Sequence, residues 1–365
     1  MASGNLKNSD KFKKYFAVLA AGYVDNDKPQ KEALHSSPQR APRPVVLDVD
    51  TGRDDAWAIL GALKELRLQA IVAGYGNITQ AQAVRNALDL VSLGRRALND
   101  IRYDQPDIKV WKGQTAPAVP TDVGLKEIER RKCTSGNGLC NLVLPASPDD
   151  AVAPQAANWA DEFAAELKRK GEKIDYLACG PMTNLSCLID AFERIDGDRH
   201  AIRNSISRVI ATGGSLDPRL RVDFNFMADP ASVQKVIDVF GADLVLAPFD
   251  ETRHLRLTES QIQTLKPGNL AAAFCRDLML AHARGWTADG VVMLHDPTTL
   301  LVAGEKVPMR TERVSVVLDG PEAGRLVRDD QGTEVRRLSI LPHRVPSWRN
   351  KLLDKYLDLE LPTFH

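Results

Sequence analysis

Short apolar runs alternate with helical spacing along the chain from Pro44 onward. Six runs are continuous, as expected of strands covered on both faces, and lie at 45–50, 69–76, 108–113, 174–180, 206–214 and 242–250. Elsewhere apolar residues recur every three or four positions, which predicts helices at 55–66, 79–94, 161–171, 182–195, 230–241, 258–266 and 269–285. Gly94 is expected to end the second helix, and residues 114–154 are expected to form loops.

This alternation predicts an α/β fold. We expect residues 44–365 to form one domain, an open, mostly parallel, Rossmann-like doubly wound sheet with helices on both faces. Alternating residues between 312 and 341 predict a small C-terminal β pair. Residues 1–43 are expected to form an N-terminal extension, with an amphipathic helix at 12–23 followed by a polar, proline-bearing linker.

Composition excludes several functional classes. Lys plus Arg equals Asp plus Glu at 48 each, so bulk charge favours neither a nucleic acid nor a membrane as partner. No apolar run approaches the ~20 residues of a membrane span. Five scattered cysteines without a CxxC motif indicate reduced thiols in a cytoplasmic protein. Lysines before an apolar stretch at 11–24 leave a secreted or periplasmic form open.

An acidic turn follows the first predicted strand. The stretch "LDVDTGRDDAWAIL" carries four aspartates, Asp48, Asp50, Asp54 and Asp55. Ligands of open α/β sheets bind beyond the carboxyl ends of strands, where these carboxylates would repel one another. A helix N-terminus relieves only ~0.3–1 kcal/mol per acid. Solvation or a divalent cation could relieve more, and the number of carboxylates favours the cation.

The same stretch resembles the signature D-x-D-P-G-x-D-D-A of the inosine–uridine-preferring nucleoside hydrolases, with Thr51 in place of proline. Four further segments are similar to those of that family and occur in its order. They are "AGYGNITQAQAVRNAL", "LACGPMTNL", "VDFNFMADPASV" and "MLHDPTTLLVA", and with the first segment they spread over most of residues 45–303.

The resemblance implies a Ca²⁺-dependent N-ribohydrolase that splits a ribonucleoside into free base and ribose. It implies that the ion is bound by the carboxylates of Asp50, Asp55 and Asp296 and by the backbone carbonyl of Cys179. The scaffold would be a homo-oligomer, a dimer or a tetramer, with a small nucleoside as its partner.

The resemblance also implies roles for the remaining residues. Asp54 would be the base that activates the attacking water, and His295 would donate a proton to the departing base. The ribose hydroxyls would be held by Asn77, Asp223 and Asn225, with Asp48 orienting the cluster from behind. These types suit N-glycosidic cleavage, because carboxylates stabilise an oxocarbenium-like state and histidine transfers protons near neutral pH.

Structural alternatives exist for several of these residues. Asn77 could be a turn or cap residue, Asn225 a strand residue, and the pair His295-Asp296 a helix start. His254 and His282 are interpreted as structural. The basic clusters "RRK" and "RNK" are interpreted as solvated faces.

Three departures from the family pattern affect substrate choice. Asp223 stands where the family has Glu, and the short loop at 215–222 lacks the asparagine that contacts the ribose 5′-hydroxyl. The segment 133–139, "CTSGNGL", lacks the histidine expected near the nucleobase. The hydrolase chemistry is therefore expected to persist, while the base preference cannot be transferred.

Two other classes compete with this interpretation. "VVLDVDTG" also fits the opening motif of haloacid-dehalogenase-like, Mg²⁺-dependent phosphatases, although Asp54 and Asp55 would then have no role. The altered pocket motivates a non-catalytic ribose or nucleoside sensor on the same scaffold.

Overall fold

The computed structural model describes residues 43–98, 101–102, 108–144 and 158–362. The helix predicted at 12–23 and nearly all of the linker lie outside these residues. Nine strands form the main sheet, in the order β11-β10-β12-β6-β5-β4-β1-β2-β3. Their bounds are β1 (Val45–Val49), β2 (Leu68–Ala73), β3 (Lys109–Lys112), β4 (Ile174–Ala178), β5 (Ile206–Thr212), β6 (Leu244–Ala247), β10 (Met309–Val316), β11 (Leu326–Arg328) and β12 (Thr333–Leu338).

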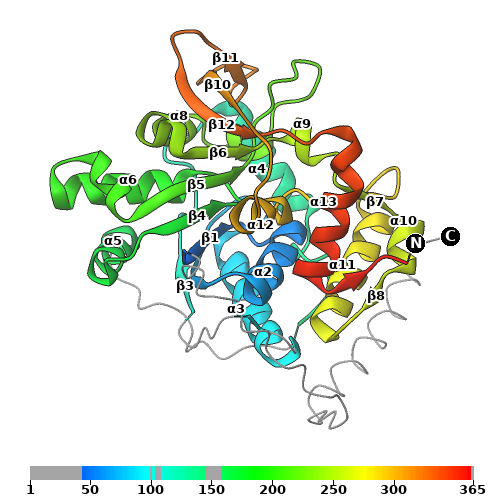
Figure 1. Ribbon diagram of the computed structural model, residues 1–365. Helices are drawn as coiled ribbons and strands as arrows, with labels where there is room; N and C mark the ends of the chain where they lie inside the picture. Colours follow the sequence, from blue (N-terminus) through cyan, green and yellow to red (C-terminus); the bar gives the residue numbers. More distant parts are fainter. Residues whose placement is uncertain (1–42, 99–100, 103–107, 145–157, 363–365) are drawn as a thin grey trace. The chain divides into compact units, whose positions relative to one another are not determined.

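The six predicted strands are all present and pair in parallel, from β3 at one edge through β1 to β6. Helices cover both faces of this sheet (Figure 1), so the predicted α/β architecture is confirmed. The helices near the sheet are α2 (Arg53–Glu65), α3 (Gln80–Ala97), α4 (Asp122–Thr134), α5 (Trp159–Lys170), α6 (Thr183–Asp196), α7 (Phe224–Ala228), α8 (Pro230–Phe240) and α12 (Pro297–Gly304).

The remaining elements are short or lie beside the sheet. The helices are α9 (Phe249–Thr252), α10 (Glu259–Thr264), α11 (Leu270–Gly285) and α13 (Val345–Lys351). Shorter turns are 3₁₀-helical at Arg199–Asn204, Gly241–Asp243 and Pro342–Arg344 and π-helical at Leu352–Tyr356. Two antiparallel pairs are formed by β7 (Arg256–Thr258) with β9 (Val291–Met293) and by β8 (Lys266–Pro267) with β13 (Leu359–Glu360). No helix among the described residues is long and apolar enough to cross a membrane.

The predicted C-terminal β pair is present as β10 and β12, but it is not separate from the sheet. β12 pairs in parallel with β6, and β11 adds a third strand beyond β10. Arg337 of β12 adds side-chain contacts to this pairing, because its NH2 donates to Asp250 Oδ2 at 2.6 Å and to Glu251 Oε1 at 3.2 Å, just after β6. Alternation along the sequence reports which face of a strand is buried but not which strand it joins.

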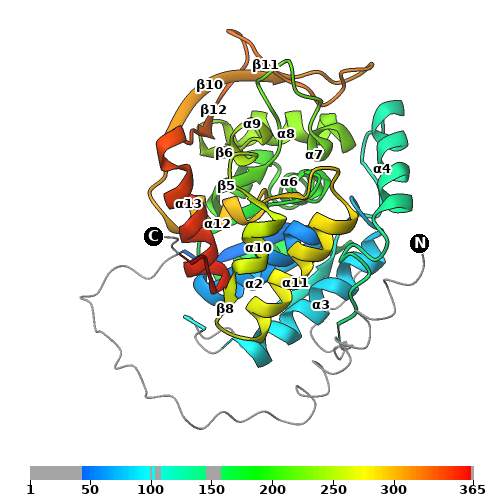
Figure 2. The same ribbon diagram turned by 90° about the vertical axis from the view of Figure 1, so that its right-hand side faces the viewer.

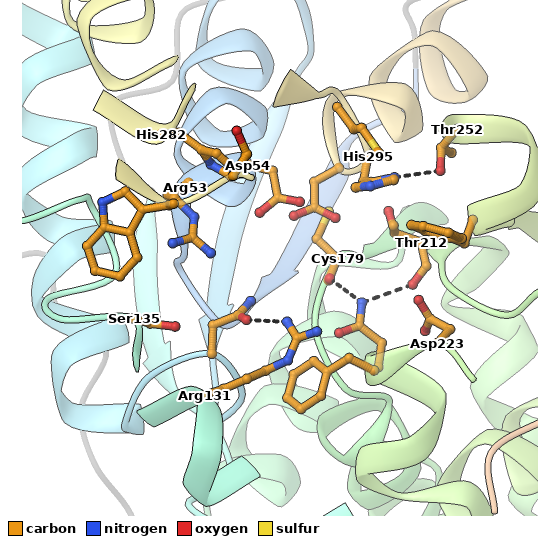
Figure 3. A pocket seen from close by; sticks show the side chains of 18 of the residues that line it. Arg53, Asp54, Arg131, Ser135, Cys179, Thr212, Asp223, Thr252, His282 and His295 are labelled. Carbon is orange, nitrogen blue, oxygen red and sulfur yellow. Dashed lines mark hydrogen bonds between the residues drawn. The ribbon is translucent and has the colours of Figure 1, made fainter. Parts of the chain in front are cut away.

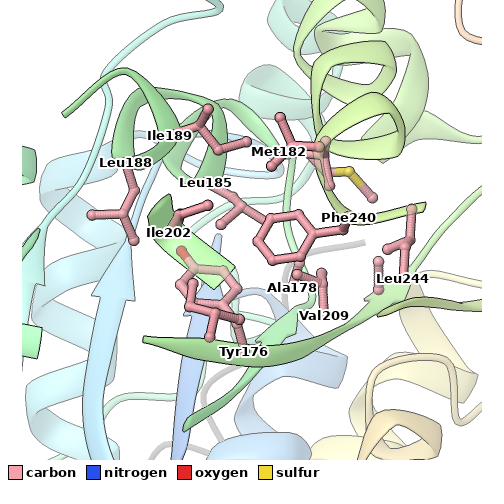
Figure 4. Packing of buried hydrophobic residues seen from close by; sticks show 14 of the residues in the cluster. Tyr176, Ala178, Met182, Leu185, Leu188, Ile189, Ile202, Val209, Phe240 and Leu244 are labelled. Atoms are coloured by element: carbon pink, nitrogen blue, oxygen red, sulfur yellow. The ribbon is translucent and has the colours of Figure 1, made fainter. Parts of the chain in front are cut away.

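An apolar cluster lies where α5, α6 and α8 pack on the sheet (Figure 4). Side chains of β4 such as Tyr176 and Ala178 meet Leu185 of α6 and Phe240 of α8, all of them buried. Tyr176 also turns its hydroxyl towards Asp48 on the neighbouring strand β1. The core therefore supports the acidic turn from behind.

The prediction that Gly94 ends a helix was wrong. α3 continues to Ala97, and Gly94 lies inside it, facing α2. A Cβ at this position would lie 2.6 Å from Leu63 Cδ1 and 3.3 Å from Leu60 Cδ2. The glycine is explained by the close approach of the two helices and not by a helix stop.

Gly94→Val is expected to lower the free energy of unfolding by about 1–3 kcal/mol, because the new side chain overpacks this contact. Gly285→Val is the matched control, since no heavy atom lies within 4 Å of a Cβ built at the end of α11. Urea unfolding measures both variants. Equal losses would contradict the packing explanation.

Candidate active site

The acidic turn connects β1 to α2 through an unusual backbone. Thr51 has φ of 41°, in the left-handed region that β-branched residues rarely adopt. Proline holds φ near −65° and could not take this conformation, so this turn needs another residue where the family signature has proline. Strain of this kind concentrates at functional sites. The turn places Asp50 at its start and Asp54 and Asp55 in the first turn of α2.

Three carboxylates converge in front of this turn. One oxygen each from Asp54, Asp55 and Asp296 lies within 4.8 Å of the others, and Asp55 and Asp296 are buried. Asp296 precedes α12 but its side chain does not cap the helix. Burial, followed by the neighbouring aspartates, raises the pKa of Asp55 and of Asp296 well above the usual range. Ionising these carboxylates therefore costs free energy through burial and mutual repulsion. Neither helix capping nor solvent removes that cost.

Helix capping accounts for only part of Asp55. Its Oδ2 accepts a hydrogen bond from Gly52 N at 2.8 Å, whereas its buried Oδ1 has no hydrogen-bond partner among the described residues. An unpaired buried carboxylate oxygen is costly unless a further ligand satisfies it. Several converging carboxylate oxygens form the kind of donor set that Ca²⁺ prefers. The residues present therefore fit a hard divalent cation.

Two further aspartates are held from the side and from behind. Asp50 Oδ2 accepts from the backbone N of Asn77 at 2.7 Å, and Asn77 Nδ2 lies 3.1 Å from both of its oxygens. Asp48 accepts from the Tyr176 hydroxyl at 2.8 Å and from Asn184 Nδ2 at 2.7 Å. Burial raises the pKa of Asp48 to about 7 in spite of these two bonds. The structure places Asp48 behind the cluster.

The backbone carbonyl of Cys179, predicted as a further metal ligand, accepts a hydrogen bond from Asn225. Asn225 Nδ2 donates to the Cys179 carbonyl at 2.7 Å and to the Thr212 carbonyl at 3.0 Å (Figure 3). Asn225 belongs to the helix α7, so the alternative of a strand residue was wrong. Asp223 caps this helix by accepting from Phe226 N at 3.2 Å. The Cys179 thiol is buried, as expected of a small apolar side chain.

His295 is oriented by a hydrogen bond and by a ring contact. Its Nδ1 lies 2.7 Å from Thr252 Oγ1, and its ring centroid lies 5.1 Å from that of Phe249. Burial is the main cause that lowers the pKa of His295, while the charge of Asp54 opposes that shift. The bond engages Nδ1, so Nε2 is the nitrogen that can exchange a proton with a ligand.

These side chains line a cavity of about 440 Å³. The predicted residues that line it are Asp54, Asn77, Cys179, Asp223, Asn225, His295 and Asp296. Four arginines also line it, together with His282, Trp286 and Phe224. Figure 3 shows Arg53 and Arg131 on the side opposite Thr252 and His295.

One sequence interpretation was wrong here, and it concerns Arg131. His282, interpreted as structural, lines the cavity, where burial and the charge of Arg53 lower its pKa to about 4. Arg131 of the "RRK" cluster is not on a solvated face. Its NH1 donates to Asn77 Oδ1 at 2.6 Å, and its Cζ lies 3.8 Å from the Phe224 ring centroid. His254 is exposed and does not line the cavity.

Arg131 escaped prediction because its helix was missed. α4 lies in the stretch expected to form loops, and only Gly124 and Ile128 are buried in it, so its apolar periodicity is weak. α4 packs beside α7 (Figure 2). The signals available were Thr121, which accepts from Gly124 N as the N-cap, and the i,i+4 pair of Glu127 with Arg131.

Comparison with known proteins agrees with this geometry. The family model described as inosine-uridine preferring nucleoside hydrolase matches residues 45–349. The pyrimidine-specific ribonucleoside hydrolase of Klebsiella pneumoniae is 27% identical over 268 residues, covering 70% of this chain and 78% of that protein. Its counterpart in Salmonella agona is 26% identical with the same coverage.

Solved structures show the same fold. A purine-preferring ribonucleoside hydrolase from Gardnerella vaginalis has a TM-score of 0.68 at 24% identity, covering 87% of this chain and 98% of its own. An inosine-guanosine nucleoside hydrolase also has a TM-score of 0.68, at 20% identity, with coverages of 86% and 98%. These relatives differ in the base they are named for, so similarity does not transfer a base preference.

The family match covers most of the chain and all the carboxylates of the site. It excludes the phosphatase alternative and gives no support to a sensor. The chain belongs to the inosine-uridine preferring nucleoside hydrolase family, and it is an N-ribohydrolase.

Proposed function

We propose that the protein hydrolyses the N-glycosidic bond of a ribonucleoside or related N-riboside in a Ca²⁺-dependent reaction, giving free base and ribose. The observation that carries this proposal is the convergence of Asp54, Asp55 and Asp296 within 4.8 Å, in a cavity that His295 also lines. A carboxylate cluster beside a histidine supplies both a base and an acid.

In this proposal the ion would be held by Asp55 and Asp296 of the converging set, by Asp50, which lies outside that set but acts on Asp55, and by the carbonyl of Cys179. A bound Ca²⁺ would lower the pKa of a coordinated water and fix the ribose through its hydroxyls. The buried Oδ1 of Asp55, which has no hydrogen-bond partner among the described residues, would be available to such an ion. Asp48 keeps its place behind the cluster through Tyr176 and Asn184.

Asp54 acts as the base because it is less buried than Asp55 and Asp296 and is the one of the four turn aspartates that lines the cavity. It takes a proton from the water that attacks C1′, while the carboxylates stabilise the positive charge that develops on ribose. His295 gives a proton to the departing base, and Phe249 and Trp286 are the aromatic side chains of the cavity lining proposed to contact that base. Asn77, Asp223 and Asn225 hold the ribose hydroxyls.

A panel of ribonucleosides and N-ribosides tests the proposal. With Ca²⁺ present, purified protein is expected to release equimolar base and reducing sugar from at least one of them. A phosphomonoester assay runs in parallel as the control for phosphatase chemistry. The absence of reducing sugar across the panel would refute the proposal.

Thr252→Val is expected to lower kcat by about tenfold or more with little change in KM, because the tautomer and orientation of His295 depend on the bond to Nδ1. Thr252→Ser restores the hydroxyl and should recover most of kcat. Steady-state kinetics on the best riboside measure both variants. A change confined to KM would show that Thr252 acts on binding instead.

We further propose that the enzyme acts as a cytoplasmic homo-oligomer, a dimer or a tetramer. All five cysteines are free thiols, in keeping with the cytoplasmic part of this proposal. Light scattering on the purified full chain decides the oligomeric state, and a monomer at micromolar concentration would contradict it.

A further inference from the structure

Four guanidinium groups line the cavity that holds the carboxylates. The four arginines come from three separate segments, α2, α4 and the loop before α7, and they are Arg53, Arg130, Arg131 and Arg221. Three aspartates, Asp54, Asp223 and Asp296, line the same cavity, so it carries charges of both signs. The proposed cation accounts for the carboxylates, but nothing in the proposed hydrolysis of a neutral nucleoside requires the arginines.

Arg131 is held rigidly in place. Its side chain is 20% exposed, its Nε lies 3.1 Å from Glu127 Oε1, and its NH1 donates to Asn77 Oδ1. The Phe224 ring supports the guanidinium plane from one side. Arg131 is therefore preorganised beside Asn77, which is one of the residues proposed to hold ribose.

Arg221 comes from the short loop that lacks the asparagine expected at the ribose 5′-hydroxyl. It lies two residues before Asp223, another residue proposed to hold ribose, and it lines the cavity while being exposed itself. Burial lowers the pKa of Arg131, Glu127 and the charge of Asp50 oppose that shift, and the like charge of Arg221 adds to it. An anion that contacts both guanidiniums would be attracted by both.

The positions of the two arginines indicate which part of a substrate carries the anion. Both lie beside residues proposed to bind ribose. The aromatic side chains that would hold the leaving base, Phe249 and Trp286, belong to other segments of the cavity wall. A phosphate monoester matches paired guanidiniums, because each fork can donate two hydrogen bonds to its oxygens.

We propose that the preferred substrates are N-ribosides with an anionic group on the ribose, namely ribonucleoside 5′-monophosphates, bound through Arg131 and Arg221. This inference rests on the proposed N-riboside hydrolysis. The oxygen of water bonds to C1′, and the C1′–N bond breaks with its electron pair passing to the base, which takes up a proton. The phosphate ester stays intact, so the products are ribose 5-phosphate and the free base.

Matched substrate pairs test this assignment. kcat/KM is measured with Ca²⁺ for inosine and its 5′-monophosphate, for uridine and its 5′-monophosphate, and for orotidine, whose carboxylate is on the base. The 5′-monophosphates are expected to exceed their parent nucleosides by about tenfold or more. Equal or lower values for the monophosphates, or a preference for orotidine alone, would overturn the inference.

Arg221→Gln is expected to reduce the ratio of kcat/KM for monophosphate over nucleoside by about tenfold. Arg219→Gln is the matched control, because Arg219 lies in the same loop, is 85% exposed, pairs with Asp217 and does not line the cavity. Arg131→Lys keeps the charge but loses the fork and should lower the same ratio. Equal ratios in Arg221→Gln and Arg219→Gln would contradict the assignment.

Failure of this inference is distinguishable from failure of the proposed function. Cleavage of nucleosides without a preference for monophosphates rejects only the inference. If no riboside is cleaved, the proposed function fails, and calorimetric binding then tests the arginines alone. Ribose 5-phosphate binding at least about tenfold more tightly than ribose, with the difference lost in Arg221→Gln, supports the site, and equal binding rejects it.

Discussion

Replacing Asp54 with asparagine is expected to lower kcat by about 10²–10⁴, because the variant retains the shape of the side chain but cannot accept the proton of the attacking water. Asp54 is only partly buried and lines the cavity, whereas its neighbour Asp55 is completely buried. The loss should therefore appear mainly in kcat. Single-turnover and steady-state kinetics on the best riboside measure it.

Calcium binding separates this role from that of a ligand. Calorimetry should find that Asp54→Asn still binds one Ca²⁺ per chain, while turnover is nearly lost. Unchanged turnover in Asp54→Asn would contradict the assigned base. A protein that bound nucleoside normally but had no turnover even before the substitution would be the sensor.

Asp55→Asn is expected to stabilise the calcium-free protein and to abolish its stabilisation by calcium. In the chelated protein, Asp55 is buried and faces Asp50 and Asp54, and burial together with this repulsion raises its pKa well above the usual range. Removing the charge should raise the free energy of unfolding of the calcium-free protein, because an amide does not carry the desolvation and repulsion that act on the buried carboxylate. The amide oxygen of the substituted side chain can still accept from Gly52 N, so the cap survives.

The stabilisation that added Ca²⁺ gives should be smaller in Asp55→Asn than in the wild type. Ca²⁺ at 100 times its dissociation constant is expected to stabilise the wild type by about 2.7 kcal/mol, and Asp55→Asn by much less. Asp319→Asn is the matched control, since Asp319 is exposed on the loop between β10 and β11. Thermal unfolding with chelator and with Ca²⁺ measures all three proteins. Equal calcium responses in wild type and Asp55→Asn would show that Asp55 is not a ligand.

Most of the fold is predictable from the sequence because its strands are buried on both faces. The continuous apolar run of β1 and the similar run of β4 differ clearly from the helical spacing between them. The attachment of β12 to β6 is not predictable, because it is a backbone pairing between segments far apart in the chain, accompanied by the ion pair of Arg337 with Asp250. Gly94 was misinterpreted because glycine is favoured both where two helices pack closely and where a helix ends, and the sequence does not distinguish the two cases.

The acidic half of the site is predictable and the basic half is not. Four aspartates within eight positions repel one another, so the sequence favours a cation over solvated acids at this turn. Arg131 and Arg221 have no such local signal, since each becomes part of the site only when α4 and the loop before α7 meet across the cavity. The left-handed conformation of Thr51 is likewise a property of the folded turn.

Activity as a function of calcium occupancy tests the central claim most directly. Protein stripped with a chelator is titrated with Ca²⁺, and the rate of reducing-sugar release from the best riboside is compared with calorimetric occupancy. We predict negligible release without the ion and a rate that rises in proportion to one bound Ca²⁺ per chain. An undiminished rate in the chelated protein would contradict the proposal that the aspartates of this turn hold a catalytic cation.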